Sequence, residues 1–119
     1  MIPALTTNID VDGPTVALRK MADEEVSGLV AVSRSRQLLG YLSSDEAVSA
    51  RHSKTPLSQV VVDMPTVQLD TLVVDIMPII YDAQTPVAVV DDKHHVRGVI
   101  IRGAVLEALA GAEGDDEHA

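Results

Sequence analysis

Two neighbouring histidines, His94 and His95, are the residues of this sequence that could most directly bind a metal ion. Imidazole nitrogens are common zinc ligands, but a zinc site needs three or four ligands together. No further ligand stands nearby in the sequence, and the chain has no Cys. We therefore expect the pair to lie in an exposed turn, and we predict no metal site.

Carboxylates and hydroxyls form two further patterns. Asp10-Val11-Asp12-Gly13 is similar to the start of a calcium loop, but the later ligands and the closing Glu are absent. Ser43 and Glu46 have the spacing of a capping box, in which both side chains satisfy free amides at a helix start. Capping alone explains both residues. Without a Cys thiol or a recognisable Ser-His-Asp set, the sequence predicts no catalytic site.

The composition limits the class of protein. The 119 residues are 46% hydrophobic, enough for a packed core, and the only aromatic residues are Tyr41 and Tyr81. The formal net charge of −9 repels phosphate backbones, so nucleic acid is excluded as a partner. The apolar runs are too short to cross a bilayer. The absence of Cys fits a cytoplasmic protein.

The sequence repeats itself at a separation of 58 residues. At this offset Gly40 aligns with Gly98, and the apolar run 29–32 aligns with the run 87–90. The apolar pattern matches along both halves without a gap, although few residues are identical. Such self-similarity predicts two copies of one structural unit.

Each half is expected to contain a strand, a helix, a strand, a turn, a strand and a helix. Asp12 and Asp70 are expected to cap the first helix of each half, and Pro14 suits a first helical turn. Pro78 falls inside the second of these helices, so we expect a kink or an early end there. The expected strands are 9–11, 29–32, 38–42, 87–90 and 96–101; the second helices run from Ser43 to about Arg51 and from about Gly103 to Gly111.

The two ends of the pattern differ from its middle. The segment 55–58 predicts a short helical lead-in to the second half, and its counterpart would lie before Met1. The first repeat thus lacks its beginning, as if cut from a longer protein. Residues 112–119 form an acidic tail that we expect to be disordered.

Repeat length, element order and the blocks 86–92 and 98–101 together resemble the CBS-domain family. The resemblance implies an α+β fold in which two β-α-β-β-α CBS repeats pack about a pseudo-twofold axis as one Bateman module. It places the repeats at 1–54 and 55–111, ahead of the tail at 112–119. It also implies a homodimer of such modules.

The run 89–109 is similar to the C-terminal CBS pair on ATP-binding subunits of glycine betaine/proline ABC importers. That resemblance implies a regulatory module at the cytoplasmic face of the membrane, which senses ionic strength or a nucleotide and gates transport. Its partners would be the ATP-binding domain of its own chain and, indirectly, the membrane permease. No Walker A loop occurs in these residues, so the chain itself is not expected to be an enzyme.

The resemblance also supplies candidate ligand-binding residues. Family members that bind adenosine nucleotides carry a Gly followed by a hydroxyl and an Asp, and the hydroxyl and the carboxylate contact phosphate and ribose. The matching residues here are Gly40, Ser43 and Glu46, although Glu46 stands where Asp is usual. In the second repeat this motif is lost, but Arg102 and the amides around Gly103 could hold a phosphate. The remaining candidates are Ser44, Thr66, Thr85 and Pro86. No cofactor is required; the ligands implied are an adenine nucleotide or, without this motif, cyclic di-AMP at the dimer interface.

Three functions remain open from the sequence. The first is the importer module, which would read salt through its charged surfaces because the Debye length falls from about 10 Å at 0.1 M to about 3 Å at 1 M. Under this hypothesis, removal of residues 112–119 shifts the salt dependence of transport. The second is an energy sensor that binds adenosine nucleotides, standalone or attached to another enzyme. The third is a structural dimerisation module.

Overall fold

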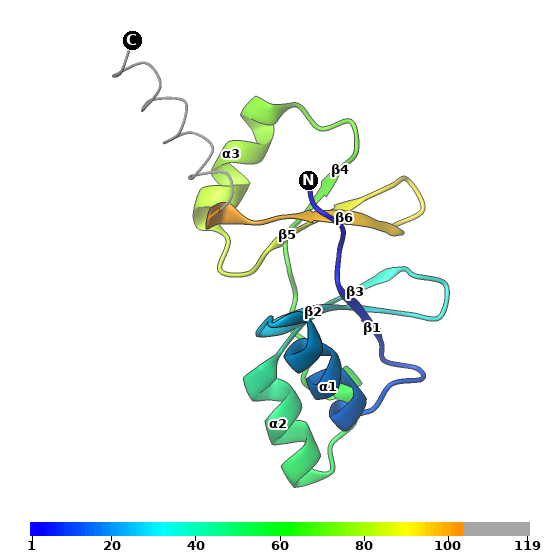
Figure 1. The fold of residues 1–119 in the computed structure, drawn as a ribbon. Coiled ribbons are helices and arrows are strands. Elements are labelled where there is room, and N and C mark those ends of the chain that lie inside the picture. Colours follow the sequence, from blue (N-terminus) through cyan, green and yellow to red (C-terminus); the bar gives the residue numbers. More distant parts are fainter. Residues whose placement is uncertain (104–119) are drawn as a thin grey trace.

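The structure, a computed structural model, describes residues 1–103 of the chain as two similar α+β units joined side by side (Figure 1). Each unit contains one three-stranded sheet. The α+β class and the two-repeat architecture predicted from the sequence are confirmed. The elements are β1 (Thr6–Asn8), α1 (Pro14–Glu24), β2 (Gly28–Val32), β3 (Leu38–Ser43), α2 (Ser44–Ser53), the 3₁₀ turn η1 (Leu57–Gln59), β4 (Thr66–Gln68), α3 (Val73–Asp82), β5 (Val87–Val90) and β6 (Val96–Ile100).

The two sheets have the same topology. In each, the first strand pairs in parallel with the second, and the second pairs antiparallel with the third, in the orders β1-β2-β3 and β4-β5-β6. Thr6 lies opposite Val30, and Thr66 lies opposite Ala88. Val30 and Ala88 are 58 residues apart, whereas Thr6 and Thr66 are 60 apart. The ungapped offset of 58 is therefore wrong ahead of the first helices.

The buried apolar residues of the described chain form three clusters. One lies between the two sheets, and each of the others lies between one sheet and the helices that cover it. A central cluster joins both sheets and contains Val30, Val32 and Val90. A second cluster packs Leu29 of β2 against α1 and α2, and a third packs Val87 and Val89 of β5 against α3. Alternate residues of β2 thus point to the helices and to the other sheet. This confirms the prediction that the run 29–32 is a strand buried on both faces.

The expected strand at 9–11 is wrong, and so are both expected aspartate caps. The first strand ends at Asn8, whose carbonyl accepts hydrogen bonds from the amides of Val11 and Asp12 and closes a turn. Gly13 occupies the N-cap of α1 without a side-chain bond, although Pro14 begins the helix as expected. The Asp12 carboxylate instead turns back toward β1. In the second half Leu72 occupies the N-cap.

Pro78 does not end its helix, since α3 continues to Asp82. A proline cannot donate to the carbonyl one turn earlier, here that of Val74. Because Val74 is 72% exposed and Pro78 also faces solvent, water can replace the missing donor. Of the two expected outcomes, the early end is wrong, and the kink stays a prediction.

Several other expectations from the sequence are confirmed. Strand β5 covers residues 87–90, the lead-in before the second half contains η1, and Ser43 is the N-cap of α2. The expected last helix at 103–111 and the acidic tail at 112–119 extend beyond the described residues, and the repeat boundaries remain predictions.

Candidate functional site

The segment just before the first strand of each repeat pairs with the third strand of the other repeat. The Ile2 amide donates to the Val99 carbonyl at 3.0 Å, and the Val99 amide donates back at 2.9 Å. Tyr41 and Val62 make the same reciprocal pair at 2.8 and 3.0 Å. These two pairs of backbone hydrogen bonds, here called the clasp, hold the two repeats together. They also place residues 2–5 beside the seam, which is the boundary between the repeats.

Two glycines make the clasp sterically possible. Gly40 has φ +152, and a Cβ placed on it would collide with the Val62 carbonyl oxygen. A Cβ on Gly98 would lie 2.8 Å from the Ile2 carbonyl oxygen. Gly40 was a candidate ligand-binding residue in the sequence, and this close approach gives it a packing role.

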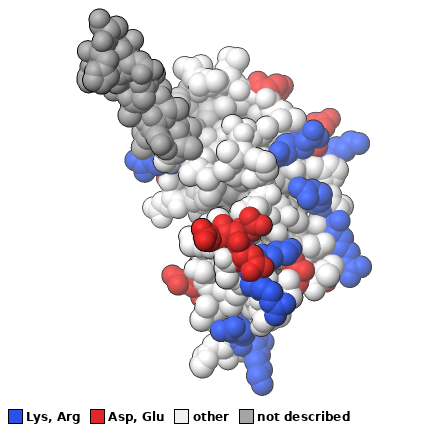
Figure 2. Space-filling view, in the orientation of Figure 1, with Lys and Arg blue, Asp and Glu red and all other residues white. Residues whose placement is uncertain are grey.

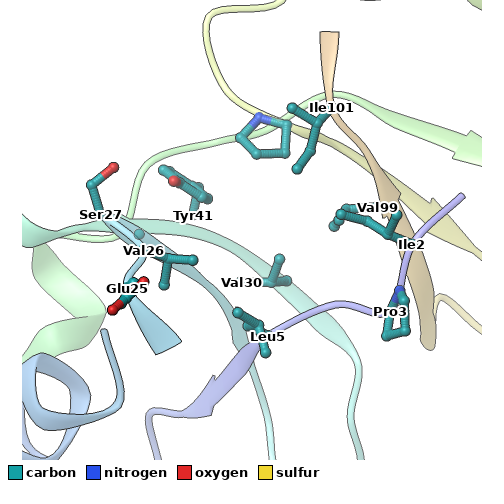
Figure 3. Close-up of a pocket in the computed structure, with 12 residues that line it drawn as sticks. Ile2, Pro3, Leu5, Glu25, Val26, Ser27, Val30, Tyr41, Val99 and Ile101 are labelled. Carbon is teal, nitrogen blue, oxygen red and sulfur yellow. The ribbon is translucent and has the colours of Figure 1, made fainter. Parts of the chain in front are cut away.

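A cavity of about 330 Å³ opens beside this seam (Figure 3). Its polar groups gather at one end, where Glu25, Ser27 and Tyr41 lie, and the opposite end is apolar. Among the described residues that line it, Glu25 is the only charged one. The full lining comprises Ile2, Pro3, Leu5, Glu25, Val26, Ser27, Gly28, Val30, Tyr41, Pro86, Val99 and Ile101.

The Tyr41 side chain forms part of the polar end of the cavity. Its ring lies against Gly28, where any larger residue would collide with the phenol. Burial raises the pKa of the Tyr41 hydroxyl above its ordinary value of 10.0. Tyr41 therefore stays a neutral hydrogen-bonding group at physiological pH.

The capping residues of α2 lie behind this cavity rather than on its wall. Ser43 Oγ accepts a hydrogen bond from the Glu46 amide at 3.2 Å, as an N-cap does. The Glu46 carboxylate makes no return bond to the Ser43 amide, so only half of the expected capping box is formed. The Ser44 amide donates to the Ser27 carbonyl at 2.8 Å, which ties the start of α2 to the segment that leads into β2. These three candidates, Ser43, Ser44 and Glu46, are not among the lining residues.

The remaining candidate residues are dispersed. Thr66 lines a separate cleft together with Gly40 and His94. The Thr85 hydroxyl donates to the Pro86 carbonyl at 3.1 Å. Arg102 and Gly103 are exposed. Of the nine candidates, only Pro86 lines the cavity at the seam.

Sequence reasoning missed Glu25 and Tyr41 as site residues. Glu25 follows the last residue of α1 and has φ 55, so it looked like an ordinary surface acid at a helix end. Tyr41 sits in an apolar strand pattern. The one available signal was that both differ from their partners at offset 58, Ala83 and Val99.

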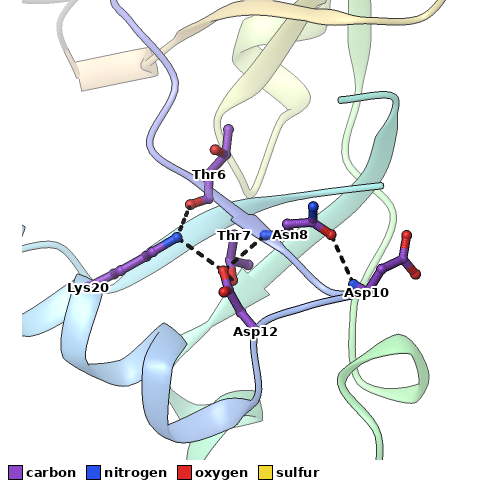
Figure 4. Close-up of polar contacts among 6 residues, drawn as sticks. All are labelled: Thr6, Thr7, Asn8, Asp10, Asp12 and Lys20. Atoms are coloured by element: carbon purple, nitrogen blue, oxygen red, sulfur yellow. Dashed lines mark hydrogen bonds and ion pairs between the residues drawn. The ribbon is translucent and has the colours of Figure 1, made fainter. Parts of the chain in front are cut away.

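A polar cluster fixes the loop between β1 and α1 (Figure 4). The Asp12 carboxylate accepts hydrogen bonds from the Thr7 hydroxyl at 3.0 Å, the Asn8 amide at 3.2 Å and Lys20 Nζ at 3.0 Å. Burial raises the pKa of the Asp12 carboxyl, but these bonds and the Lys20 charge outweigh it, so the pKa lies below its usual value. Thr7, which is fully buried, is satisfied by this carboxylate.

The turns of the two β-hairpins lie side by side at one edge of the molecule. The Leu38 amide donates to the His94 carbonyl at 3.0 Å, and the Val96 amide donates to the Arg36 carbonyl at 3.2 Å. His94 is exposed, as expected, whereas His95 is half-buried and bridges to Gln37. Within residues 1–103, no group of three or more metal-binding side chains is placed to hold a metal ion.

This hairpin edge carries much of the positive charge of the protein. Figure 2 shows Lys and Arg side chains gathered at the right, where Figure 1 places the two turns. Four of the nine Lys and Arg residues lie in or beside these turns, namely Arg34, Arg36, Lys93 and Arg97. Acidic residues there include Asp91, Asp92 and Asp10, whose carboxylate accepts from the Arg34 amide at 3.2 Å.

Asp91 organises the second of these turns. Its carboxylate accepts from the Lys93 amide at 2.9 Å and from the His95 amide at 3.0 Å. The His95 amide bond is the main cause of a lowered Asp91 pKa; burial opposes it, and the Lys93 amide and the nearby His95 and Arg97 charges add to it. In the first repeat Ser33 Oγ holds the matching place and accepts from the Gln37 amide.

The chain has two curated relatives of similar description. It is 36% identical over 122 residues to the glycine betaine transport ATP-binding protein OpuAA of Bacillus subtilis, covering 97% of this chain. It is 37% identical over 115 residues to the glycine betaine/carnitine transport ATP-binding protein GbuA of Listeria monocytogenes, covering 95% of this chain. The chain spans 29% of the length of each relative, in its C-terminal part. No family model matches the chain.

Solved structures share the fold. Staphylococcus aureus OpuCA superposes with a TM-score of 0.86 at 24% identity and covers 93% of this chain and 96% of its own. CbpB in complex with c-di-AMP gives 0.78 at 16% identity, covering 97% and 82%. The CBS-pair protein CBSX2 of Arabidopsis thaliana gives 0.72 at 17% identity, covering 94% and 88%.

Within residues 1–103, no helix has the length and apolar character needed to cross a membrane. The repeated topology, the clasp between the repeats and these neighbours agree with one another. The chain is therefore a tandem CBS-domain pair, similar to the C-terminal region of ATP-binding proteins of glycine betaine transport.

Proposed function

We propose that this CBS pair regulates an osmoprotectant ABC importer from within its ATP-binding subunit. In this role it senses ionic strength or a nucleotide at the cytoplasmic face of the membrane and gates transport. The two curated relatives, both named as ATP-binding proteins of glycine betaine transport, support this function. The ATP-binding domain of the same subunit would be its direct partner, and the permease would be reached through that domain.

The basic hairpin edge is the observation that carries the ionic-strength form of this proposal. It concentrates Arg34, Arg36, Lys93 and Arg97 in a chain whose net charge is −9. Attraction between such an edge and an anionic surface of the importer assembly is strong in dilute salt. It weakens as the Debye length falls from about 10 Å at 0.1 M to about 3 Å at 1 M. Rising salt would then release the module and open the gate.

Residues 2–5 supply a route from the module to the ATP-binding domain. Ile2 is hydrogen-bonded to Val99 of β6, and residues 2–5 also form one wall of the cavity. In the relatives the matched region is C-terminal, so the ATP-binding region precedes it in the chain. A shift of the repeats at their seam would therefore pull directly on the connection to the ATPase.

Charge variants in the intact importer test this proposal. The double variant Arg36→Gln and Arg97→Gln removes two charges from the hairpin edge. We expect uptake to become active at lower salt, because the attraction to be screened is weaker. The matched control, Arg19→Gln and Arg51→Gln, removes two exposed charges from α1 and α2. Equal salt curves for wild type and both double variants would contradict a role for the edge.

A second candidate function is the binding of an adenine compound between the repeats. The cavity at the seam favours it, because its volume of about 330 Å³ suits a small ligand. The neighbour CbpB is described in complex with c-di-AMP. Calorimetry with AMP, ATP and cyclic di-AMP tests the idea. Saturable AMP binding that Ile101→Trp weakens would support the cavity as the binding site. AMP binding that Ser43→Ala and Glu46→Ala abolish would support a site at the start of α2 instead. No binding of any of the three compounds would contradict this function.

We also propose that the module acts as a homodimer. The start of α3 presents Leu72, Val73 and Val74 at exposures of 66%, 72% and 72%. An apolar surface of this kind is typical of a protein–protein contact. Sedimentation equilibrium should show a dimer; a monomer at high concentration would exclude both the dimer and a purely structural dimerisation role.

A further inference from the structure

We infer that Glu25 determines which ligands enter the cavity between the repeats, favouring uncharged or cationic heteroaromatic molecules over phosphorylated ones. This inference rests on the ligand-binding form of the proposed function. It adds the selection of ligands by charge, which the descriptions of the relatives and solved neighbours do not mention.

The lining of the cavity is the first support. Eight of its twelve lining residues are aliphatic or proline, and they provide an apolar body of the kind that holds a flat ring. Ser27 and Tyr41 offer uncharged hydroxyls at one end. The only charge contributed by the described lining residues is the Glu25 carboxylate. The part of the cavity wall formed by residues 1–103 thus offers a phosphate no cationic partner.

The end of α1 makes this side of the cavity more negative still. Glu25 continues an acidic run with Asp23 and Glu24, and the last turn of α1 contains no basic residue. The partial negative charge of a helix C-terminus also lies here. The nearby cation, Lys20, is already paired with Asp12 at 3.0 Å. A dianionic phosphate close to this end is therefore repelled, whereas an amino or cationic group is attracted.

Arg102 is the residue that would reverse this preference. It is exposed and follows Ile101, which lines the apolar end of the cavity. If its guanidinium holds a phosphate, phosphorylated ligands bind more tightly despite Glu25. Selection by Glu25 and phosphate binding by Arg102 therefore predict opposite orders of affinity for two ligands that differ only in a phosphate.

Adenosine and AMP are suitable probes because they differ only in the phosphate. We expect calorimetry on the full chain at low salt to show adenosine binding about three- to tenfold more tightly than AMP, as two charges near Glu25 in a mostly aqueous setting would give. The ratio of the affinities for adenosine and AMP should become smaller in 0.5 M salt, where screening is stronger. Glu25→Gln should lower this ratio in the same way, and Asp75→Asn, an exposed acid on α3, should leave it unchanged.

Two further variants keep the outcome decisive. Ile101→Trp adds bulk at a partly exposed wall position and should weaken both probes, with a melting curve to check folding. AMP binding more tightly than adenosine, and losing that advantage in Arg102→Gln, would overturn the inference while leaving ligand binding intact. Equal affinities unaffected by Glu25→Gln would overturn it too. Binding of neither probe would reject both the inference and the ligand-binding function, but not the ionic-strength function.

Discussion

The carbonyl oxygen of Val62 occupies the place where a side chain on Gly40 would begin. The two residues belong to different repeats, and the neighbouring Tyr41 pairs with Val62 through both backbone groups. A single methyl group at Gly40 would therefore act on the joint between the repeats.

Gly40→Ala should destabilise the chain by about 2–4 kcal/mol, since it combines a strained φ of +152 with a backbone collision. Urea unfolding measures the change in the free energy of unfolding. Gly103→Ala is the matched control, because a Cβ there meets no atom of residues 1–103 within 4 Å, and it should stay within about 0.5 kcal/mol of wild type. Equal effects of the two substitutions would show that the clasp does not depend on this glycine.

Sequence reasoning found the parts of the fold that depend on local pattern. The apolar run 29–32 predicted a doubly buried strand, and Ser43 with Glu46 predicted a helix start; both are confirmed. These features follow from side-chain burial and from hydrogen bonds within a few residues. They need no knowledge of how the repeats pack.

The errors arose where tertiary contacts override local preference. Asp12 precedes Gly13 and Pro14 and looked like a helix cap, but a buried Thr7 hydroxyl and Lys20 draw its carboxylate away. The cavity was also missed, because its wall combines residues 2–5 with β2, β3 and β6. No local pattern marks residues that meet only after the two repeats pack together.

The Asp12 cluster should make folding stability depend on pH in the acid range. The folded-state pKa is lowered, so its stabilisation is present above the ordinary value of 3.8 and disappears as pH falls through the folded pKa. Asp12→Asn should cost about 1 kcal/mol at pH 7, a modest value because Lys20 is 45% exposed. In urea titrations, the difference in the free energy of unfolding between variant and wild type should disappear by pH 2. A difference of the same size at both pH values would mean that charge plays no part.

The turn that Asp91 organises should keep its hydrogen bonds when Asp91 is replaced by Ser, but not when it is replaced by Ala. Ser33 already performs the same task in the first repeat, where its hydroxyl accepts from the Gln37 amide. Asp91→Ala leaves the amides of Lys93 and His95 without their acceptor, so their hydrogen exchange should accelerate roughly fivefold. Asp91→Ser should restore most of the protection. Equal exchange in the Ala and Ser variants would argue against the equivalence of the two turns.

Removal of the whole module tests the regulatory role most directly. Glycine betaine uptake would be measured in proteoliposomes across a range of KCl concentrations, with the intact ATP-binding subunit and with one lacking residues 1–119 of this chain. Uptake by the intact importer should rise steeply with salt, whereas the shortened importer should transport at a rate nearly independent of salt. The same salt dependence in both importers would mean that the CBS pair does not regulate transport.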